Sequence, residues 1–135
     1  MKVLDLGRGP AMASIFLARE HGVEVWASEL WIPAEENAAR FDQTGVGDQV
    51  HAVRAEAHDL PFESEQFDAV LSVDRYHYFG SDDLYVGYIG KFLKTGGQLS
   101  IAVPSPHREL RELGGAPEYL RSGVGWEVLA FHTPG

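Results

Sequence analysis

The sequence predicts an α/β fold: a doubly wound, mainly parallel sheet of about five strands with helices on both faces. Three observations lead to this prediction. Five short apolar segments alternate with stretches long enough for a helix, which is the pattern of βαβ units. Residues 69–71 (AVL) and 99–103 (LSIAV) are apolar with little polar alternation, as expected for central strands buried on both faces. The chain of 135 residues is also of a size for one domain and one core.

The predicted strands are short and apolar, and glycine, proline or polar residues bound them. The sequence places them at residues 2–6, 24–27, 50–55, 67–73 and 97–103. The Gly96-Gly97 pair should turn the chain into the last strand.

Three helices are predicted between these strands. The first covers residues 12–21 and ends at Gly22, because glycine favours the left-handed conformation that closes a helix. The second covers residues 33–41, begins at Pro33 and places Ala34, Ala38 and Phe41 on one face. The third covers residues 82–93 and is weakened by two internal glycines.

The regular pattern ends at residue 103. We therefore predict a core over residues 1–103 and an irregular C-terminal extension over residues 104–135, with a short helix near 107–113 and one further strand at 128–131. The first strand begins at Met1 with no helix before it, so we expect the chain to be cropped at both ends.

Composition excludes several classes of function. A formal charge of −9 repels phosphate backbones, so nucleic acid is not an expected partner. The chain has no cysteine, which excludes disulfides and thiolate metal sites, and no histidine–carboxylate spacing predicts a metal. Without a secretory signal or an apolar run of membrane-spanning length, we expect no membrane insertion and a cytoplasmic location.

A glycine-containing loop follows the first strand. Asp5, Gly7 and Gly9 lie where the strand ends, and glycines there let the backbone approach a ligand and present amide donors at the start of a helix. Taken alone, the loop could be no more than a tight strand-to-helix turn. Glu29 at the end of the second strand changes this interpretation, because an acid about 20 residues after such a loop can bind the hydroxyls of a ribose.

The identity of the ligand depends on the details of this loop. A dinucleotide-binding loop needs a third glycine where this chain has Met12. S-adenosylmethionine (SAM) has no phosphate but has a sulfonium and an amino group, which favour a carboxylate such as Asp5 just before the loop. The loop thus favours SAM over NAD.

Five segments together resemble class I SAM-dependent methyltransferases, in the order of that family and across residues 1–103. They are residues 3–9 (VLDLGRG), 26–29 (WASE), 55–62 (AEAHDLPF), 67–74 (FDAVLSVD) and 93–99 (LKTGGQL). Among subgroups the sequence is most similar to small-molecule methyltransferases related to the cyclopropane-fatty-acid synthases and the ubiquinone-biosynthesis methyltransferases. The resemblance implies a Rossmann-like core.

The resemblance also implies a set of cofactor-binding residues. Glu56 would meet the amino group of adenine, and Ala57 would offer its backbone amide to the ring. With the residues of the loop and the second strand, the full predicted set is Asp5, Gly7, Gly9, Glu29, Leu30, Glu56, Ala57 and Asp74.

Two residues depart from the family pattern. Arg8 stands where a small residue is usual, and its guanidinium is unfavourable near a sulfonium unless it turns toward the methionine carboxylate. Ala11 replaces the usual third glycine and adds a methyl group where the backbone lies close to the ligand. The helices that cover the SAM pocket and the strands that complete the sheet in this family are not found in the sequence.

His77 is the predicted catalytic residue. It lies after the fourth strand, where the acceptor should meet the methyl group, and a histidine can remove a proton near neutral pH. The alternative is that His77 and the aromatic residues beside it only pack the loop. Near the cofactor, Trp31 is expected to border the adenosine, whereas Trp26, within a strand, is expected in the core.

We therefore predict an enzyme that transfers the methyl group of SAM to a small molecule. One alternative is a non-catalytic remnant of this fold, which could form a homodimer to cover exposed sheet edges. Another, less favoured by the loop, is an NAD(P)-binding module.

Overall fold

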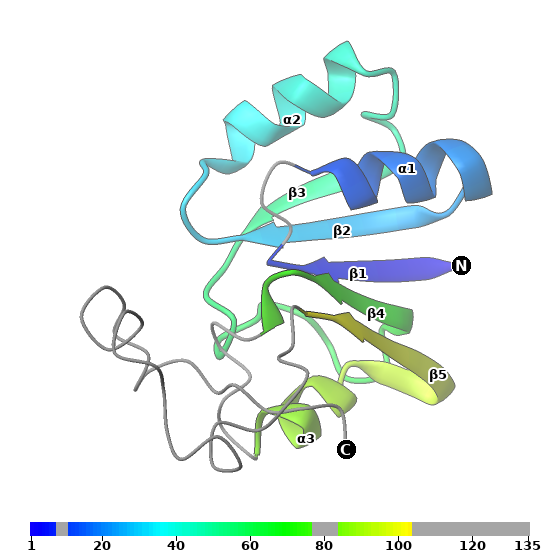
Figure 1. The fold of residues 1–135 in the computed structure, drawn as a ribbon, viewed down its shortest axis with the longest axis vertical. Coiled ribbons are helices and arrows are strands. Elements are labelled where there is room, and N and C mark those ends of the chain that lie inside the picture. Colours follow the sequence, from blue (N-terminus) through cyan, green and yellow to red (C-terminus); the bar gives the residue numbers. More distant parts are fainter. Residues whose placement is uncertain (8–10, 77–83, 104–135) are drawn as a thin grey trace, which may run out of the picture.

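The computed structural model describes residues 1–7, 11–76 and 84–103, and confirms the predicted α/β class (Figure 1). Its sheet has five strands, all parallel, in the order β3-β2-β1-β4-β5. The elements are β1 (Lys2–Leu6), α1 (Met12–His21), β2 (Glu24–Glu29), α2 (Ala34–Gln43), β3 (Val50–Arg54), β4 (Phe67–Val73), α3 (Tyr85–Gly90) and β5 (Leu93–Ala102).

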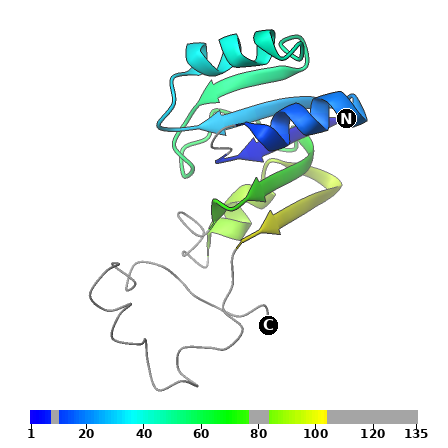
Figure 2. The same cartoon turned by 45° about the horizontal axis from the view of Figure 1, so that its top comes forward.

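The sheet is covered on both faces because neighbouring residues of each strand point in opposite directions. On β1, Val3 joins one buried cluster and Leu4 joins the other. The first cluster packs against α1 and α2, and the second against α3. In Figures 1 and 2, α1 and α2 lie beside the β1–β3 half of the sheet, whereas α3 lies near β5. This arrangement is the predicted doubly wound sheet.

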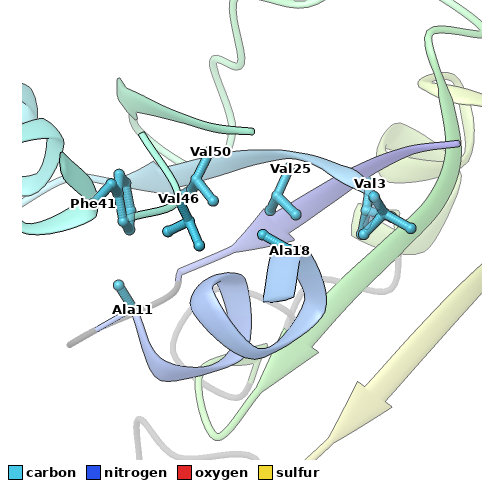
Figure 3. Close-up of a cluster of buried hydrophobic side chains, with 9 residues drawn as sticks. Val3, Ala11, Ala18, Val25, Phe41, Val46 and Val50 are labelled. Carbon is cyan, nitrogen blue, oxygen red and sulfur yellow. The ribbon is translucent and has the colours of Figure 1, made fainter. Parts of the chain in front are cut away.

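The first cluster is built mainly from small and branched side chains (Figure 3). Phe41 of α2 is its largest member and is fully buried. The predicted face of α2 is only partly right: Ala38 is exposed, and Asn37 is buried in its place. Hydrophobicity alone selects the alanine, but Asn37 lies four residues before Phe41 and therefore on the same side of the helix.

The ends of α1 and α2 have local causes. Gly22 ends α1 as predicted: it adopts the left-handed conformation (φ 62°) and its N–H donates to the carbonyl of Ala18. Helix α2 begins at Ala34, one residue after the predicted start, because Pro33 keeps an extended ψ of 141°.

Helix α3 is shorter than predicted in the part of the chain that the structure describes. It spans Tyr85–Gly90, and the chain re-enters the sheet at Leu93, which was expected to end the helix. The predicted start at Asp82, and the elements expected at 107–113 and 128–131, lie outside the described residues. No described helix is long and apolar enough to cross a bilayer.

Strand β5 was expected to be central and to begin at residue 97. Within the described residues it lies at the edge of the sheet, beside β4 only, and Ser100, Ile101 and Ala102 are exposed. An apolar strand can cover either position, so composition did not distinguish them. The strand starts early because an irregularity in its pairing with β4 takes in the glycine pair: Phe67 aligns with Leu93, and Ala69 with Gln98.

The surroundings of Gly97 and Gly87 predict opposite effects on stability when each is replaced by alanine. A Cβ atom on Gly97 would lie 2.9 Å from the carbonyl oxygen of Lys94 and 3.1 Å from that of Asp68, whereas one on Gly87 meets nothing within 4 Å. We expect Gly97→Ala to lower the free energy of unfolding by about 1–3 kcal/mol, as overpacking does. Gly87→Ala should raise it by about 0.5–1 kcal/mol, because alanine favours the helix. Urea unfolding measures both, and equal effects would contradict the described packing.

Candidate functional site

A pocket opens at the carboxyl end of the sheet, beside the point where the order of the strands across the sheet reverses. Strands β2 and β3 lie on one side of β1, and β4 and β5 lie on the other, so the reversal falls between β1 and β4. Ligands of open parallel sheets bind at this point. The lining residues come from the ends of β1 and β2 and from the segments after β2, β3 and β4: Gly7, Ser28, Glu29, Leu30, Trp31, Ala55, Glu56 and Arg75.

Glu29 is the most constrained acid of this pocket. It is the last residue of β2 and is 5% exposed. Its Oε1 accepts hydrogen bonds from the backbone N–H groups of Leu30 at 2.8 Å and Trp31 at 3.2 Å. These bonds turn the chain sharply at the strand end and hold the carboxylate at the pocket wall.

Asp5, the predicted carboxylate before the glycine loop, is buried between β1 and α1. It is 1% exposed, and the Ser14 hydroxyl of α1 donates a hydrogen bond to its Oδ2 at 2.5 Å. It does not appear among the residues that line the pocket. Asp5 therefore ties the first turn of α1 to β1.

Gly7 lies on the pocket wall, as the loop prediction requires. Its N–H donates to the carbonyl of Ser28 at 3.1 Å and so joins the ends of β1 and β2. Its φ of 68° lies in the left-handed region, which glycine adopts without strain. Gly9 and the neighbouring Arg8 lie outside the described residues.

Ala11, where the resemblance expects a third glycine, also adopts the left-handed conformation. Its φ is 68° and its ψ is 12°, it immediately precedes α1, and its side chain is fully buried in the first cluster. That conformation costs an L-residue about 1–2 kcal/mol relative to the right-handed one. The backbone thus keeps the form that suits a glycine, although the residue is alanine.

Glu56 also lines the pocket, two residues after the end of β3. Both of its carboxylate oxygens accept hydrogen bonds from His58: Oε2 from the backbone N–H at 2.9 Å and Oε1 from Nδ1 at 3.0 Å. The ring hydrogen bond is the main reason why the pKa of Glu56 lies below its ordinary value, while partial burial opposes the shift. The backbone amides of His58 and Ala57 lower the pKa further, so the carboxylate is charged at neutral pH.

Ala57 is half-buried and takes no part in the pocket lining. Its carbonyl accepts a hydrogen bond from the Tyr85 hydroxyl at 2.9 Å, and its side chain packs against the second cluster. The residue is thus fixed beside Glu56 at the edge of the site.

The segment after β4 brings a cation to the pocket. Arg75 lines it, whereas the predicted Asp74 is exposed and lies outside the lining. Asp74 has a φ of 56°, and its N–H donates to the carbonyl of Ala102 at 2.6 Å. A non-glycine residue in this conformation is strained, and such strain often occurs at functional sites. His77, the predicted base, lies outside the described residues.

Of the predicted set, the structure brings Gly7, Glu29, Leu30 and Glu56 together around one pocket. The two tryptophans separate: Trp31 lines the pocket and is 69% exposed, whereas Trp26 is partly buried and packs edge-on against Phe67. Ser28, Ala55 and Arg75 line the pocket but were not among the predicted site residues. Each lies within two residues of the end of a strand, and this position is the signal that could have found them.

The charged residues of the pocket suit a ligand with hydroxyl or cationic groups. Glu29, Glu56 and Arg75 all contribute to its lining. Carboxylates accept hydrogen bonds only, so they select donors such as ribose hydroxyls and amino groups. Among the described residues, no group of three or more histidines and carboxylates gathers that could hold a metal ion.

Comparison with known proteins assigns a family to this architecture. Residues 3–97 match a family described as a methyltransferase domain. The sarcosine/dimethylglycine N-methyltransferase of Aphanothece halophytica is 27% identical over 104 residues, which are 76% of this chain and 38% of that protein. The erythromycin 3''-O-methyltransferase of Saccharopolyspora erythraea is 34% identical over 120 residues, which are 84% of this chain and 37% of that protein. The chain thus spans less than half the length of these curated relatives.

A solved structure agrees on the fold. The geranyl diphosphate C-methyltransferase of Streptomyces coelicolor A3(2), solved in complex with Mg²⁺, geranyl diphosphate and S-adenosyl-L-homocysteine, superposes with a TM-score of 0.64 at 22% identity. The superposition covers 73% of this chain and 37% of that one. At this identity the likeness establishes the fold alone.

The hydrogen bond between His58 and Glu56 predicts a measurable titration. In the His58→Ala variant the ring donor is lost, so the pKa of Glu56 should rise toward its ordinary value. Because the pKa of Glu56 is lowered in the folded state, its hydrogen bond with His58 stabilises the fold at neutral pH. This contribution is lost as the pH falls through the pKa of the folded state. A ¹³C NMR titration of the Glu56 carboxyl measures this.

The matched control is His51→Ala, which removes a histidine paired with Glu24 at 2.9 Å on the strands β2 and β3. It should leave the titration of Glu56 unchanged. If both variants leave it unchanged, the described contact between His58 and Glu56 is wrong.

Proposed function

This chain belongs to the methyltransferase domain family, and we propose that it binds SAM in the pocket at the carboxyl end of its sheet and transfers the methyl group to a small molecule. The observation that supports this most directly is the buried Glu29 carboxylate, which the backbone of the next two residues holds at the wall of that pocket.

The residues of the pocket fit the parts of SAM. Glu29 accepts hydrogen bonds from the two ribose hydroxyls, and Glu56 accepts from the amino group of adenine. Gly7 allows the backbone to approach the ligand closely at the end of β1. Leu30 and Trp31 offer apolar surface beside Glu29. The described chain therefore has an acceptor for each donor of the adenosine.

Asp5 is proposed as a residue of the same site. Its bond to Ser14 ties the first turn of α1 to β1, the two elements that the glycine loop connects in the sequence. Arg75, on the segment after β4, lines the same pocket and is suited to an anionic group, such as the carboxylate of the methionine part.

The chemistry of the reaction needs little from the protein beyond positioning. SAM, when bound, supplies a methyl group on a positively charged sulfur that is already a good leaving group. The chain orients the acceptor and excludes water, which are the main sources of rate in such a displacement. We propose residues 1–103 as the SAM-binding core, and residues 104–135 as an extension toward the acceptor.

Binding of the cofactor product is the first test. Titration calorimetry with S-adenosylhomocysteine should detect binding to the wild-type chain, and Glu29→Gln should weaken it about 10- to 150-fold, the value of hydrogen bonds to a charged group. Glutamine keeps the size of the side chain and an oxygen for the Leu30 and Trp31 amides. The control is Glu35→Gln, at an exposed position in the first turn of α2, which should bind normally.

Two results would reject the proposal that SAM is the ligand: no heat with S-adenosylhomocysteine from a folded sample, or binding of NADH in its place. Equal affinity of the Glu29 and Glu35 variants would reject the role of Glu29 while leaving binding intact.

His77 is proposed as the base when the acceptor must lose a proton. We expect His77→Ala to lower kcat about 10²- to 10⁴-fold while the Kd for SAM stays unchanged. Methyl transfer from labelled SAM to acceptors of the classes named for the relatives, an amine such as sarcosine and an oxygen acceptor such as erythromycin, measures this effect. A proportional loss of SAM affinity would show instead that His77 packs the site.

A further inference from the structure

The turn that contains Glu56 is held from behind by α3. The turn itself closes with a backbone hydrogen bond from the Asp59 N–H to the Glu56 carbonyl at 3.0 Å. Two tyrosines of α3 contact the backbone on either side of its tip. The Tyr85 hydroxyl donates to the carbonyl of Ala57 at 2.9 Å, and the Tyr88 hydroxyl accepts from the N–H of Leu60 at 2.8 Å.

The two tyrosines are placed so that both can bind the backbone of this turn. They are three residues apart on α3 and therefore lie on the same side of the helix. Tyr85 is 1% exposed, and burial raises the pKa of its phenol above the ordinary value, so the hydroxyl remains a donor. The ring of His58, at the tip of the turn, packs edge-on against the ring of Tyr85 at 4.8 Å.

Tyr85 acts on Glu56 indirectly, through Ala57 and through His58. Tyr85 fixes the carbonyl of Ala57, the residue next to Glu56, and its ring supports His58, which donates two hydrogen bonds to the Glu56 carboxylate. The aromatic packing and the backbone hydrogen bond thus act on the same carboxylate. Removing the hydroxyl would leave the Ala57 carbonyl without this donor and let the turn shift.

We propose that Tyr85 is a positioning residue for adenine recognition: by its hydrogen bond to the Ala57 carbonyl and its contact with His58, it aims the Glu56 carboxylate at the adenine amino group. This inference rests on the proposed binding of SAM. Tyr85 itself lies behind the turn and outside the pocket lining. Small displacements of such a group cost affinity, because recognition needs the acceptor within hydrogen-bond distance of its donor.

The test compares two ligands that differ at one position of the base. S-inosylhomocysteine has a carbonyl oxygen where S-adenosylhomocysteine has the adenine amino group, so it lacks the amino donor from which Glu56 is proposed to accept. Wild-type protein should prefer the adenine ligand at least about 10-fold. Tyr85→Phe keeps the ring and removes the hydroxyl; it should weaken the adenine ligand about 3- to 10-fold and the inosine ligand less than about 2-fold.

A general loss of structure would weaken both ligands equally, so the ratio of the two affinities isolates positioning. Thr44→Val is the matched control, because it also removes a hydroxyl that donates to backbone carbonyls, at the end of α2 and remote from the pocket. It should leave both affinities unchanged. If Tyr85→Phe does not fold, Tyr88→Phe, which removes the acceptor of the Leu60 N–H, is measured with the same two ligands and should also reduce the preference for adenine.

Each outcome separates this inference from the proposed function. If wild-type protein binds neither ligand, the proposed binding of SAM and the role of Tyr85 are both rejected. If it binds the two ligands equally, SAM binding stands, but adenine recognition by Glu56 and the role of Tyr85 are rejected. An unchanged preference in the tyrosine variant that folds, or an equal loss for both ligands, rejects the positioning role alone.

Discussion

The candidate site depends on the central position of β1, which is hydrogen-bonded to β2 on one side and to β4 on the other. Since all five strands are parallel, their carboxyl ends meet at one edge of the sheet. Because the chain continues to opposite sides of β1 after β1 and after β3, the connections diverge at that edge and leave room for a pocket. Gly7 at the end of β1 and Glu29 at the end of β2 reach the same pocket for this reason.

The parts of the site that follow strand ends could be predicted from the sequence. Glu29 is the last residue of β2 and Glu56 comes two residues after β3, and the parallel topology brings both to a common edge. What the sequence could not supply is the direction of a side chain. Asp5 also lies near a strand end, yet its carboxylate turns to Ser14, because strand residues alternate between faces and this one points to α1.

Prediction also failed where several packings satisfy the same pattern. The face of α2 includes Asn37 rather than Ala38, and β5 lies at the edge of the described sheet although its sequence is apolar enough for the centre. The role of Tyr85 could not be predicted for a related reason. Its contact with Ala57 joins residues 28 positions apart, and no local sequence pattern indicates such a contact.

Two non-glycine residues beside the ends of β4 and α1 are strained, and two carboxylates of the pocket are held in place. Ala11 and Asp74, which precede α1 and follow β4, both adopt the left-handed conformation that costs ordinary residues free energy. The carboxylates of Glu29 and Glu56 are both held by nearby N–H groups. Preorganised acceptors of this kind lose little freedom when a ligand binds, which favours affinity.

Glu29 is proposed to bind the ribose of SAM through its carboxylate, and a crystal structure of the chain with S-adenosylhomocysteine would measure that contact. Both ribose hydroxyls should lie about 2.5–3.0 Å from the carboxylate oxygens of Glu29. A ligand bound elsewhere, or bound in this pocket with its ribose away from Glu29, would show that Glu29 does not bind the ribose.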